Sequence, residues 1–327
     1  MRIPFIPTIL EHAASTIGVT PSAAACDGVL MAEAHIQAWK RYRHGAVTVG
    51  IDVYNAEAEA LGCEIRFFQD NSVPGIISRP GDGLDVDECV TVMEKASCGA
   101  EIRGRLPMLL KSARQVKTSI GGSVPVGLGV SGPFSICCEW MGFENCIMTC
   151  ITDPAAARDL MQRVADFLIN WCRLITKEGI GITLFESWAA PPLLSPKLYH
   201  QFAAPWEKTV IDSIIQAGGK IPTLVIGGDT SVMLDDMIST GTGMIVCDYN
   251  ADMQLFVKAA QNNHLRLRGN IDPKLVASGS VESILNQAKR RIQSASGYPE
   301  FVLGTGVLPY DTSAGNIDAL SEWLRES

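Results

Sequence analysis

The sequence lacks the features that mark membrane, secreted and nucleic-acid-binding proteins. It has no uninterrupted apolar run of about 18 residues, the length that a membrane-spanning helix needs. Residues 1–7 carry one positive charge but no long apolar stretch and no signal cleavage pattern. The formal net charge is −8, whereas a nucleic-acid binder normally shows a basic patch or stripe. We therefore expect a cytoplasmic protein that binds neither membranes nor nucleic acids.

Cysteine is plentiful but lacks the spacing of a metal site or a disulfide framework. None of the ten cysteines forms a Cys-x-x-Cys pair, and no Cys and His are spaced as in a zinc finger. Cys137 and Cys138 are adjacent, and Cys146 and Cys150 are four residues apart. Because free cysteine is a common small core residue, most of these thiols are predicted to be buried and reduced, in a reducing compartment.

The chain also lacks a Gly-x-Gly-x-x-Gly motif after its first apolar run, which disfavours a dinucleotide-binding Rossmann fold. Instead, short apolar runs recur, each followed by polar or glycine-rich residues and then a helical pattern. Strands alternating with helices predict right-handed βαβ units and a parallel sheet. Eight runs are predicted to be strands: 3–10, 46–53, 124–130, 182–186, 223–226, 244–247, 265–268 and 301–303. Eight units favour a single (β/α)8 barrel domain spanning residues 1–327.

Three helices and one inserted hairpin can be predicted between these strands. The helices cover residues 21–42 with Ser22 near the start, residues 154–177 capped by Asp153, and residues 196–216 after Ser195. The segment 56–79 is longer than an ordinary loop of a barrel. Its runs at 64–68 and 75–78 predict a hairpin inserted after the second strand.

Polar residues at the carboxyl ends of the strands are the natural site candidates, because the active site of such a barrel lies there. They are Glu11, His12, Asp52, Asn55, Ser131, Glu186, Ser187, Asp229, Thr230, Asp248, Asn250, Asn270, Asp272 and Thr305. Carboxylates and amides dominate this set, and arginine and lysine are nearly absent. Such a set suits a neutral heterocycle with amino and lactam groups, such as a pterin, because carboxylates and amides match its N–H donors and carbonyl. A polyanionic substrate would require arginines instead.

Some of these residues have an equally good structural interpretation. Asp229 and Asp272 precede predicted helices, so each could serve only as a helix N-cap. Asn270 is therefore the better site candidate within the segment 269–273. Glu186 ends a strongly apolar strand, where a carboxylate that is only exposed to solvent is less expected than a functional one. This position therefore favours a role in the site.

Several motifs resemble the uroporphyrinogen-decarboxylase-like family over nearly the whole chain. They are Leu10-Glu11-His12-Ala13-Ala14, Asp52 with the Ala-Glu-Ala-Leu-Gly run at 58–62, Leu194-Ser195-Pro196, Val246-Cys247-Asp248, Gly269-Asn270-Ile271-Asp272-Pro273, and Gly304-Thr305-Gly306. The resemblance implies a (β/α)8 barrel, in agreement with the strand pattern. True decarboxylases of this family carry an arginine-bearing segment after the first strand. Here the segment 7–13 has Glu11 instead, which disfavours uroporphyrinogen decarboxylation.

The 58–62 run is more similar to the corrinoid-dependent methyltransferase branch of the family. Thiol-methylating members of that branch bind zinc through His-x-Cys at the fifth strand and a Cys near the eighth. This sequence has Val225, Gly227 and Val307 at those places. A thiol needs such activation because it is mostly protonated at neutral pH, whereas the N5 amine of tetrahydrofolate already carries a lone pair. The resemblance thus implies tetrahydrofolate as methyl acceptor and no metal bound by this chain.

The implied reaction moves a methyl group from protein-bound methylcobalamin to N5 of tetrahydrofolate, as in anaerobic demethylation systems that use glycine betaine or methoxyaromatic compounds. No Asp-x-His-x-x-Gly cobalamin motif is present, so the cobalamin is expected on a separate corrinoid-binding protein. The residues assigned to catalysis are Glu186, Asn270 and Asp248. Those assigned to the pterin are Asp229, Asp248, Asn250, Asn270, Asn55 and Thr305.

Three alternatives stay open at this point. The chain could demethylate a small compound and pass the methyl group to a corrinoid protein. It could be a decarboxylase or lyase of a smaller substrate, or a catalytically silent binding protein. Its oligomeric state, monomer or homodimer, is also left open by the sequence.

Overall fold

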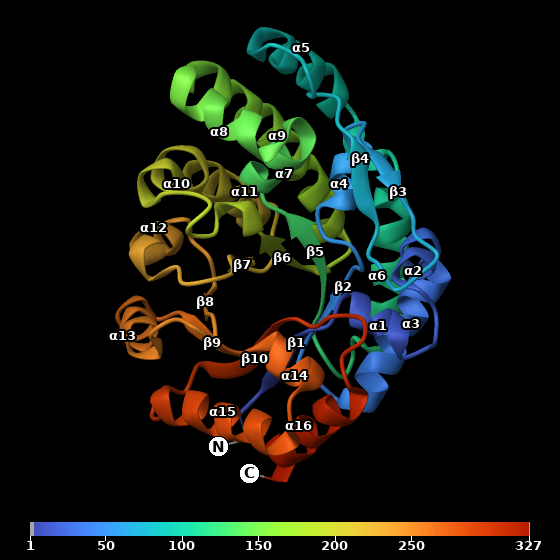
Figure 1. Ribbon diagram of the computed structural model, residues 1–327, viewed down its shortest axis with the longest axis vertical. Helices are drawn as coiled ribbons and strands as arrows, with labels where there is room; N and C mark the ends of the chain where they lie inside the picture. Colours follow the sequence, from blue (N-terminus) through green and yellow to red (C-terminus); the bar gives the residue numbers. More distant parts are fainter. Residues whose placement is uncertain (1–2, 327) are drawn as a thin grey trace.

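Parallel strands occupy the centre of the computed structural model, which describes residues 3–326. In Figure 1 they follow one another in chain order around the centre, and the helices lie outside them. All eight predicted strands are confirmed. Within the described residues they are β1 (Phe5–Thr8), β2 (Val47–Val49), β5 (Val126–Ser131), β6 (Gly181–Phe185), β7 (Thr223–Val225), β8 (Met244–Cys247), β9 (Arg266–Ile271) and β10 (Phe301–Val307).

The strand ladders form two halves instead of one closed ring. One sheet has the order β1-β10-β9-β8 and the other the order β2-β5-β6-β7, all pairs being parallel. Between the halves, the N–H of Gly45 donates to the carbonyl of Phe5 at 2.7 Å and that of Gly243 to the carbonyl of Pro222 at 2.9 Å. Within residues 3–326 no ladder joins β1 to β2 or β7 to β8. The α/β architecture is thus as predicted, but hydrogen-bonded closure of the barrel is not seen.

The helices are α1 (Glu11–Ser15), α2 (Pro21–Cys26), α3 (Gly28–Tyr42), α4 (Asn55–Ala60), α5 (Val86–Ser97), α6 (Leu106–Ile120), α7 (Pro133–Met141), α8 (Phe143–Thr152), α9 (Pro154–Lys177), α10 (Pro196–Phe202), α11 (Ala204–Gln216), α12 (Leu234–Ser239), α13 (Met253–Asn263), α14 (Pro273–Ser278), α15 (Val281–Ser294) and α16 (Ala314–Glu326). Three short 3-10 helices are η1 (Ala100–Ile102), η2 (Ser187–Ala189) and η3 (Ser231–Met233). None of these helices of residues 3–326 is long and apolar enough to cross a membrane.

Two of the three predicted helices are interrupted. The helix predicted at 21–42 breaks at Asp27, whose backbone is extended and whose carboxylate caps α3. Its first turn is capped by Thr20 and not by Ser22. The helix predicted at 196–216 breaks at Ala203 into α10 and α11. The helix 154–177 is confirmed as α9, with the Asp153 side chain accepting from the N–H of Ala156.

The predicted hairpin after the second strand is present as the antiparallel pair β3 (Glu64–Arg66) and β4 (Gly75–Ser78). Its connecting loop reaches the segment that follows β10, where the Asn71 amide donates to the Asp311 carboxylate at 3.0 Å. The insertion therefore links the two halves of the strand ring on the side where the strands end.

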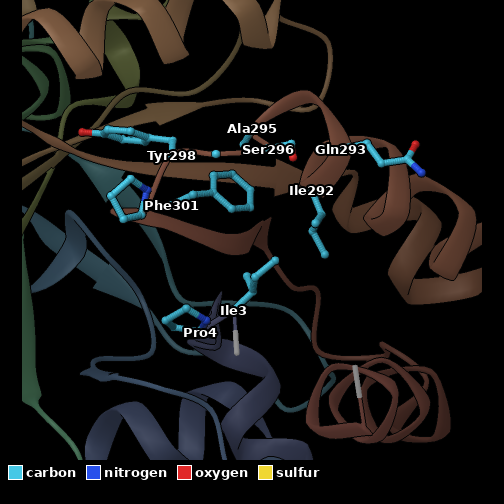
Figure 2. A pocket seen from close by; sticks show the side chains of 10 residues that line it. Ile3, Pro4, Ile292, Gln293, Ala295, Ser296, Tyr298 and Phe301 are labelled. Carbon is cyan, nitrogen blue, oxygen red and sulfur yellow. The ribbon is translucent and has the colours of Figure 1, made fainter. Parts of the chain in front are cut away.

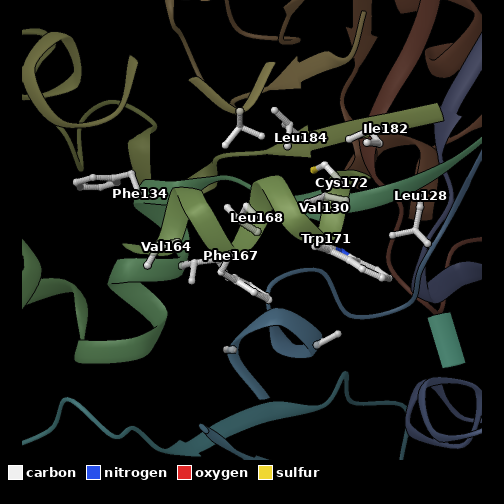
Figure 3. Packing of buried hydrophobic residues seen from close by; sticks show 14 of the residues in the cluster. Leu128, Val130, Phe134, Val164, Phe167, Leu168, Trp171, Cys172, Ile182 and Leu184 are labelled. Carbon is white, nitrogen blue, oxygen red and sulfur yellow. The ribbon is translucent and has the colours of Figure 1, made fainter. Parts of the chain in front are cut away.

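The outward faces of the strands pack against the helices. In Figure 3, Leu128 and Val130 of β5 and Leu184 of β6 lie beside Leu168 and Trp171 of α9. All five side chains are fully buried. Because side chains alternate along a strand, the residues between them must face the centre of the ring.

One acid is buried without full compensation in this outer layer. Glu207 of α11 is fully buried and accepts from the Tyr199 hydroxyl at 2.6 Å, while its Oε1 has no partner among the described residues. Burial first, and then the nearby carboxyl of Glu186, hold the pKa of Glu207 well above its ordinary value of 4.5.

This raised pKa predicts a pH-dependent effect of Glu207→Gln on stability. A raised pKa in the folded state contributes stability below the unfolded pKa, and this contribution is lost as the pH rises. The glutamine keeps an acceptor for Tyr199 but has no proton to lose. From about pH 5 to about pH 8, we expect the variant to gain at least about 1.4 kcal/mol in free energy of unfolding relative to the wild type, the equivalent of one pKa unit. Urea unfolding at both pH values measures it, with the exposed Glu322→Gln as control. Parallel pH profiles for wild type and Glu207→Gln would contradict the prediction.

Candidate active site

The centre of the strand ring, which we term the lumen, is lined on one side by small residues. A side chain at Gly129 would contact Phe185 and Thr48, so these three positions share the inward face. Typical (β/α)8 barrels fill this space with layers of bulky branched side chains. The inward residues of β2, β5, β6 and β7 that instead keep partial solvent exposure are Thr48, Gly127, Gly129, Thr183, Thr223 and Val225. Water can therefore enter the lumen along this wall.

The opposite wall is polar and joins four strands by hydrogen bonds. Asp248, which follows β8, accepts from the N–H of Gly228 at 2.8 Å and from the Asn270 amide at 3.4 Å. Asn270 of β9 in turn accepts from Nε of Arg268 at 3.1 Å, and Nη2 of Arg268 donates to the Thr8 hydroxyl at 3.1 Å. All but Gly228 are nearly or fully buried. The predicted site residues Asp248 and Asn270 thus lie together.

Thr305 closes this network on β10. Its Oγ1 accepts from the N–H of Thr8 at 3.3 Å and donates to the carbonyl of Gly306 at 2.7 Å. Its neighbour must be glycine, because a Cβ at Gly304 would lie 2.7 Å from Cδ of Arg268. The absence of a side chain at position 304 therefore gives Arg268 its place in the wall.

Arg268 is the residue that the sequence analysis missed. The predicted site residues include no arginine, although Arg268 is the last residue of the strand predicted at 265–268, because the candidates on this strand, Asn270 and Asp272, come after it. Arg268 lies two positions before Asn270, and the alternation of a strand places both on one face. Burial lowers its pKa to about 10, so the guanidinium stays protonated at neutral pH.

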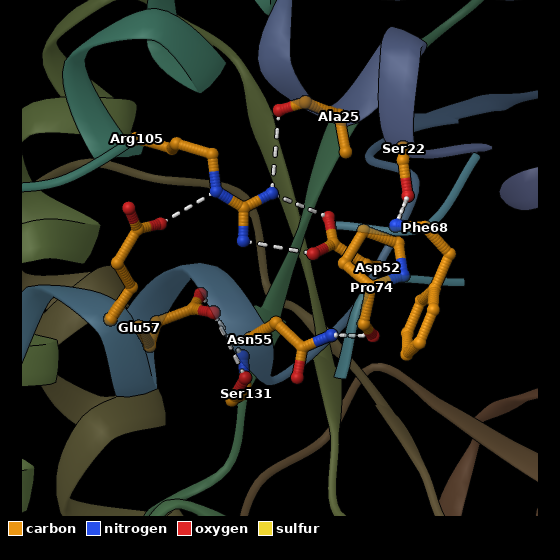
Figure 4. A network of polar contacts seen from close by, with 10 residues as sticks. Ser22, Ala25, Asp52, Asn55, Glu57, Phe68, Pro74, Arg105 and Ser131 are labelled. Atoms are coloured by element: carbon orange, nitrogen blue, oxygen red, sulfur yellow. Dashed lines mark hydrogen bonds and ion pairs between the residues drawn. The ribbon is translucent and has the colours of Figure 1, made fainter. Parts of the chain in front are cut away.

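A second polar network lies where β2 ends, and Figure 4 shows it. Arg105 at the start of α6 binds the Asp52 carboxylate through two nitrogens, at 2.9 Å and 2.8 Å, and Glu59 through Nε at 2.6 Å. Burial raises the pKa of Asp52, and the nearby guanidinium of Arg105 offsets this effect only in part. This paired, desolvated carboxylate anchors the loop after β2 to α6.

The predicted pterin ligand Asn55 belongs to this second network. Its amide donates to the carbonyl of Pro74 at 2.5 Å, so it ties α4 to the inserted hairpin. The buried Glu57 nearby accepts from the Ser131 hydroxyl at 3.0 Å. The structure brings Asn55 together with the hairpin and places it in a different network from Asp248 and Asn270.

Glu186 lies on the outward face of β6, in line with Leu184, and is fully buried. Its carboxylate accepts from the N–H groups of Phe134 at 3.3 Å and Ser135 at 2.5 Å, in the first turn of α7. Burial raises its pKa to about 7 despite these bonds. A carboxylate at a helix N-terminus is favourable, and the contacts are those of a residue that anchors α7. The catalytic role assigned to Glu186 stays a prediction.

Three more of the predicted residues follow the ends of β7, β8 and β9. Asp229 is exposed and accepts from both the N–H and the hydroxyl of Ser231. Asn250 is exposed in the turn after β8. Asp272 accepts from the N–H of Lys274 at 2.9 Å, which confirms its interpretation as a helix cap.

The three positions that correspond to zinc ligands in the resemblance described above have no metal-binding atom in their side chains. Val225 ends β7, Gly227 follows it, and Val307 ends β10. Across the described part of the chain, no group of three or more His, Cys, Asp or Glu residues is placed to hold a metal ion.

A cavity of about 440 Å³ lies at the other end of the strands, where β1 and β10 begin. Figure 2 shows Ile3, Pro4, Ile292, Tyr298 and Phe301 around it. It is lined mainly by apolar groups, and none of the predicted site residues reaches it. The polar wall of the lumen is therefore the better candidate for chemistry.

Known proteins resemble this chain in sequence and in fold. A curated methylcobamide:CoM methyltransferase, MtbA, of Methanosarcina mazei is 24% identical over 271 residues, 82% of this chain and 76% of the relative. A solved methyltransferase from Methanosarcina mazei has the same fold, with a TM-score of 0.86 at 19% identity over 99% of this chain and 94% of the other.

Curated uroporphyrinogen decarboxylases match as well. The one from Christiangramia forsetii is 24% identical over 68% of this chain and 67% of its own length. The one from Parasynechococcus marenigrum is 30% identical over 48% of this chain, but the match spans only 44% of the relative. The sequence profile of the family described as uroporphyrinogen decarboxylase (URO-D) matches residues 1–327. The chain belongs to the URO-D family.

Proposed function

We propose that this chain is a methyltransferase that moves a methyl group from a corrinoid, carried by a partner protein, to N5 of tetrahydrofolate. The observation that carries the proposal is the hydrogen-bonded pair Asp248 and Asn270 at the ends of β8 and β9, facing a lumen that water can enter. A carboxylate beside an amide can accept the amino and N–H donors of a pterin ring. The kinship with a methylcobamide-dependent methyltransferase supports the corrinoid as the methyl source.

The choice of an amine acceptor over a thiol rests on the strand ends β7 and β10. A thiol acceptor must be converted to its thiolate, for which zinc is one means. Val225, Gly227 and Val307 offer no metal ligand at these positions. The N5 amine of tetrahydrofolate needs no such activation, because its lone pair is available at neutral pH.

The proposed reaction is an in-line displacement. The methyl carbon forms a bond to N5 while its bond to cobalt breaks, leaving the electron pair on cobalt, and N5 loses its proton to water. Asp248 and Asn270 orient the ring, and Thr305 acts through Thr8 and Arg268, which it contacts. Asp229 and Asn250 act at the rim, Asn55 acts by holding the inserted hairpin, and Glu186 acts through the position of α7. Much of the rate comes from alignment of carbon, nitrogen and cobalt.

Methylcobalamin and tetrahydrofolate together test the assignment. We expect the cobalamin spectrum to change as the methyl group leaves, with 5-methyltetrahydrofolate formed in equal amount. Asp248→Asn should lower kcat/KM by at least about tenfold, because a hydrogen bond to a charged group contributes about 1.5–3 kcal/mol. Asp252→Asn is the matched control: Asp252 is an exposed cap in the same loop, and asparagine also caps well.

The acceptor and the substrate class are decided by the same assay. Demethylation of methylcobalamin with 2-mercaptoethanesulfonate but not with tetrahydrofolate would overturn the folate assignment. Methylation of cobalamin by a small methylated compound, without any reaction of folate, would instead identify a demethylating enzyme.

Removal of metal tests the zinc argument separately. Because the three positions lack ligands, we expect full activity with tetrahydrofolate after prolonged dialysis against a chelator. Elemental analysis of the active protein should find far less than one zinc per chain. One equivalent of zinc, together with loss of activity on its removal, would contradict the prediction.

A further inference from the structure

Arg268 is a buried cation without a carboxylate partner. Among the described residues it forms no ion pair within 4.0 Å, and its hydrogen bonds go to Asn270, Thr8 and the carbonyl of Thr305, all neutral acceptors. Only Nε and Nη2 make these bonds. Nη1 has no hydrogen-bond partner among the described residues, and protein atoms do not enclose it completely. Burial of an unpaired charge costs free energy. An acceptor at Nη1 would therefore stabilise the guanidinium of Arg268.

The charge that balances Arg268 lies at the other end of the same hydrogen-bond chain. Asp248 accepts from Asn270, and Asn270 accepts from Arg268. The amide therefore separates a negative and a positive group that line the same wall of the lumen. Such a strip is neutral as a whole but dipolar. It complements a ligand edge that has an N–H donor beside a carbonyl oxygen. It does not favour a ligand with a net negative charge, because Asp248 repels such a ligand.

We propose that Asp248, Asn270 and Arg268 together bind the lactam edge of the ring substrate, with Arg268 donating to its carbonyl oxygen. This inference rests on the proposed folate function and names the group that selects the ring. In a tetrahydropterin the 2-amino group and N3–H are donors next to the C4 carbonyl. Asp248 receives the donors, and Nη1 of Arg268 supplies the bond to oxygen.

Small residues line part of the lumen. Gly127, Gly129, Thr48 and Thr183 keep partial solvent exposure, whereas the bulkier Phe185 on the same inward face is buried. Gly304 lets the aliphatic stem of Arg268 lie against β10, since a Cβ there would come within 2.7 Å of Cδ of Arg268 and within 2.9 Å of Oδ1 of Asn270.

A pair of ligands that differ at one position tests this assignment. Tetrahydrofolate has a carbonyl at C4, whereas its 4-amino-4-deoxy analogue has an amino group there and no hydrogen on N3. We expect the wild-type protein to bind the 4-oxo ligand at least about tenfold more tightly, the factor that a charged hydrogen bond supplies. Arg268→Gln should reduce this preference by about tenfold or more. Gly304→Ala, which keeps the charge but displaces it, should also reduce it.

Arg266→Gln is the matched control, because Arg266 begins the same strand and is exposed. It should keep the wild-type preference. A merely structural Arg268 would weaken both ligands equally and leave their ratio unchanged. An unchanged ratio in Arg268→Gln, with folded protein by circular dichroism, therefore overturns the inference while methyl transfer to tetrahydrofolate still stands.

Two further outcomes are distinct. Absence of binding and turnover with tetrahydrofolate in the wild type overturns the proposed function and, with it, the lactam assignment. Dimethylglycine, a small carboxylate, probes the other possibility. If the wild type binds it, Arg268→Gln does not, and neither protein prefers one folate, then Arg268 holds a carboxylate and the lactam assignment alone is overturned.

Discussion

The alternation of side chains along the parallel strands is the constraint on which the rest of this structure depends. Each strand must bury one face against helices, and the apolar residues of β5 and β6 meet α9 in this way. The other face is released from that demand and can carry glycine, threonine or charge. The lumen and its polar wall exist because the outward faces alone supply the hydrophobic core.

The same constraint explains what the sequence could and could not predict. Apolar runs identify strands well, because burial requires them, and every predicted strand was found. Hydrogen-bonded closure was not found, because a ladder needs two strands in register over several residues, and only single backbone bonds cross the two seams. The break of the predicted helix at Ala203 has a signal in the sequence, because Pro205 lacks a backbone N–H and suits only the first turn of a new helix. At Asp27, a good N-cap residue followed by glycine is a second usable signal.

The sequence alone does not tell which side chains at the strand ends face the lumen. Glu186 and Asn270 both close strands and seemed equivalent. Glu186 continues the outward row of Leu184, and its carboxylate holds α7, whereas Asn270 continues the inward row of Arg268. Alternation along the observed strands separates them, because Arg268 and Asn270 share one face of β9. The charge of Arg268 changes the chemistry expected of the wall.

A site built on a dipolar strip holds a different class of ligand from a site built on a metal ion. A zinc ion binds a soft, anionic acceptor and needs only a few ligands at fixed places. A strip with Asp248 at one end and Arg268 at the other exerts its strongest field between them and little at a distance, because opposite charges screen one another. It therefore binds most tightly a ligand whose own hydrogen-bond donor and acceptor are adjacent and rigidly spaced. A fused ring meets that requirement without loss of conformational freedom, whereas a flexible chain must be ordered first. In the proposed function, the metal-free positions Val225, Gly227 and Val307 and the buried Arg268 thus serve the same acceptor, an amine on a fused ring.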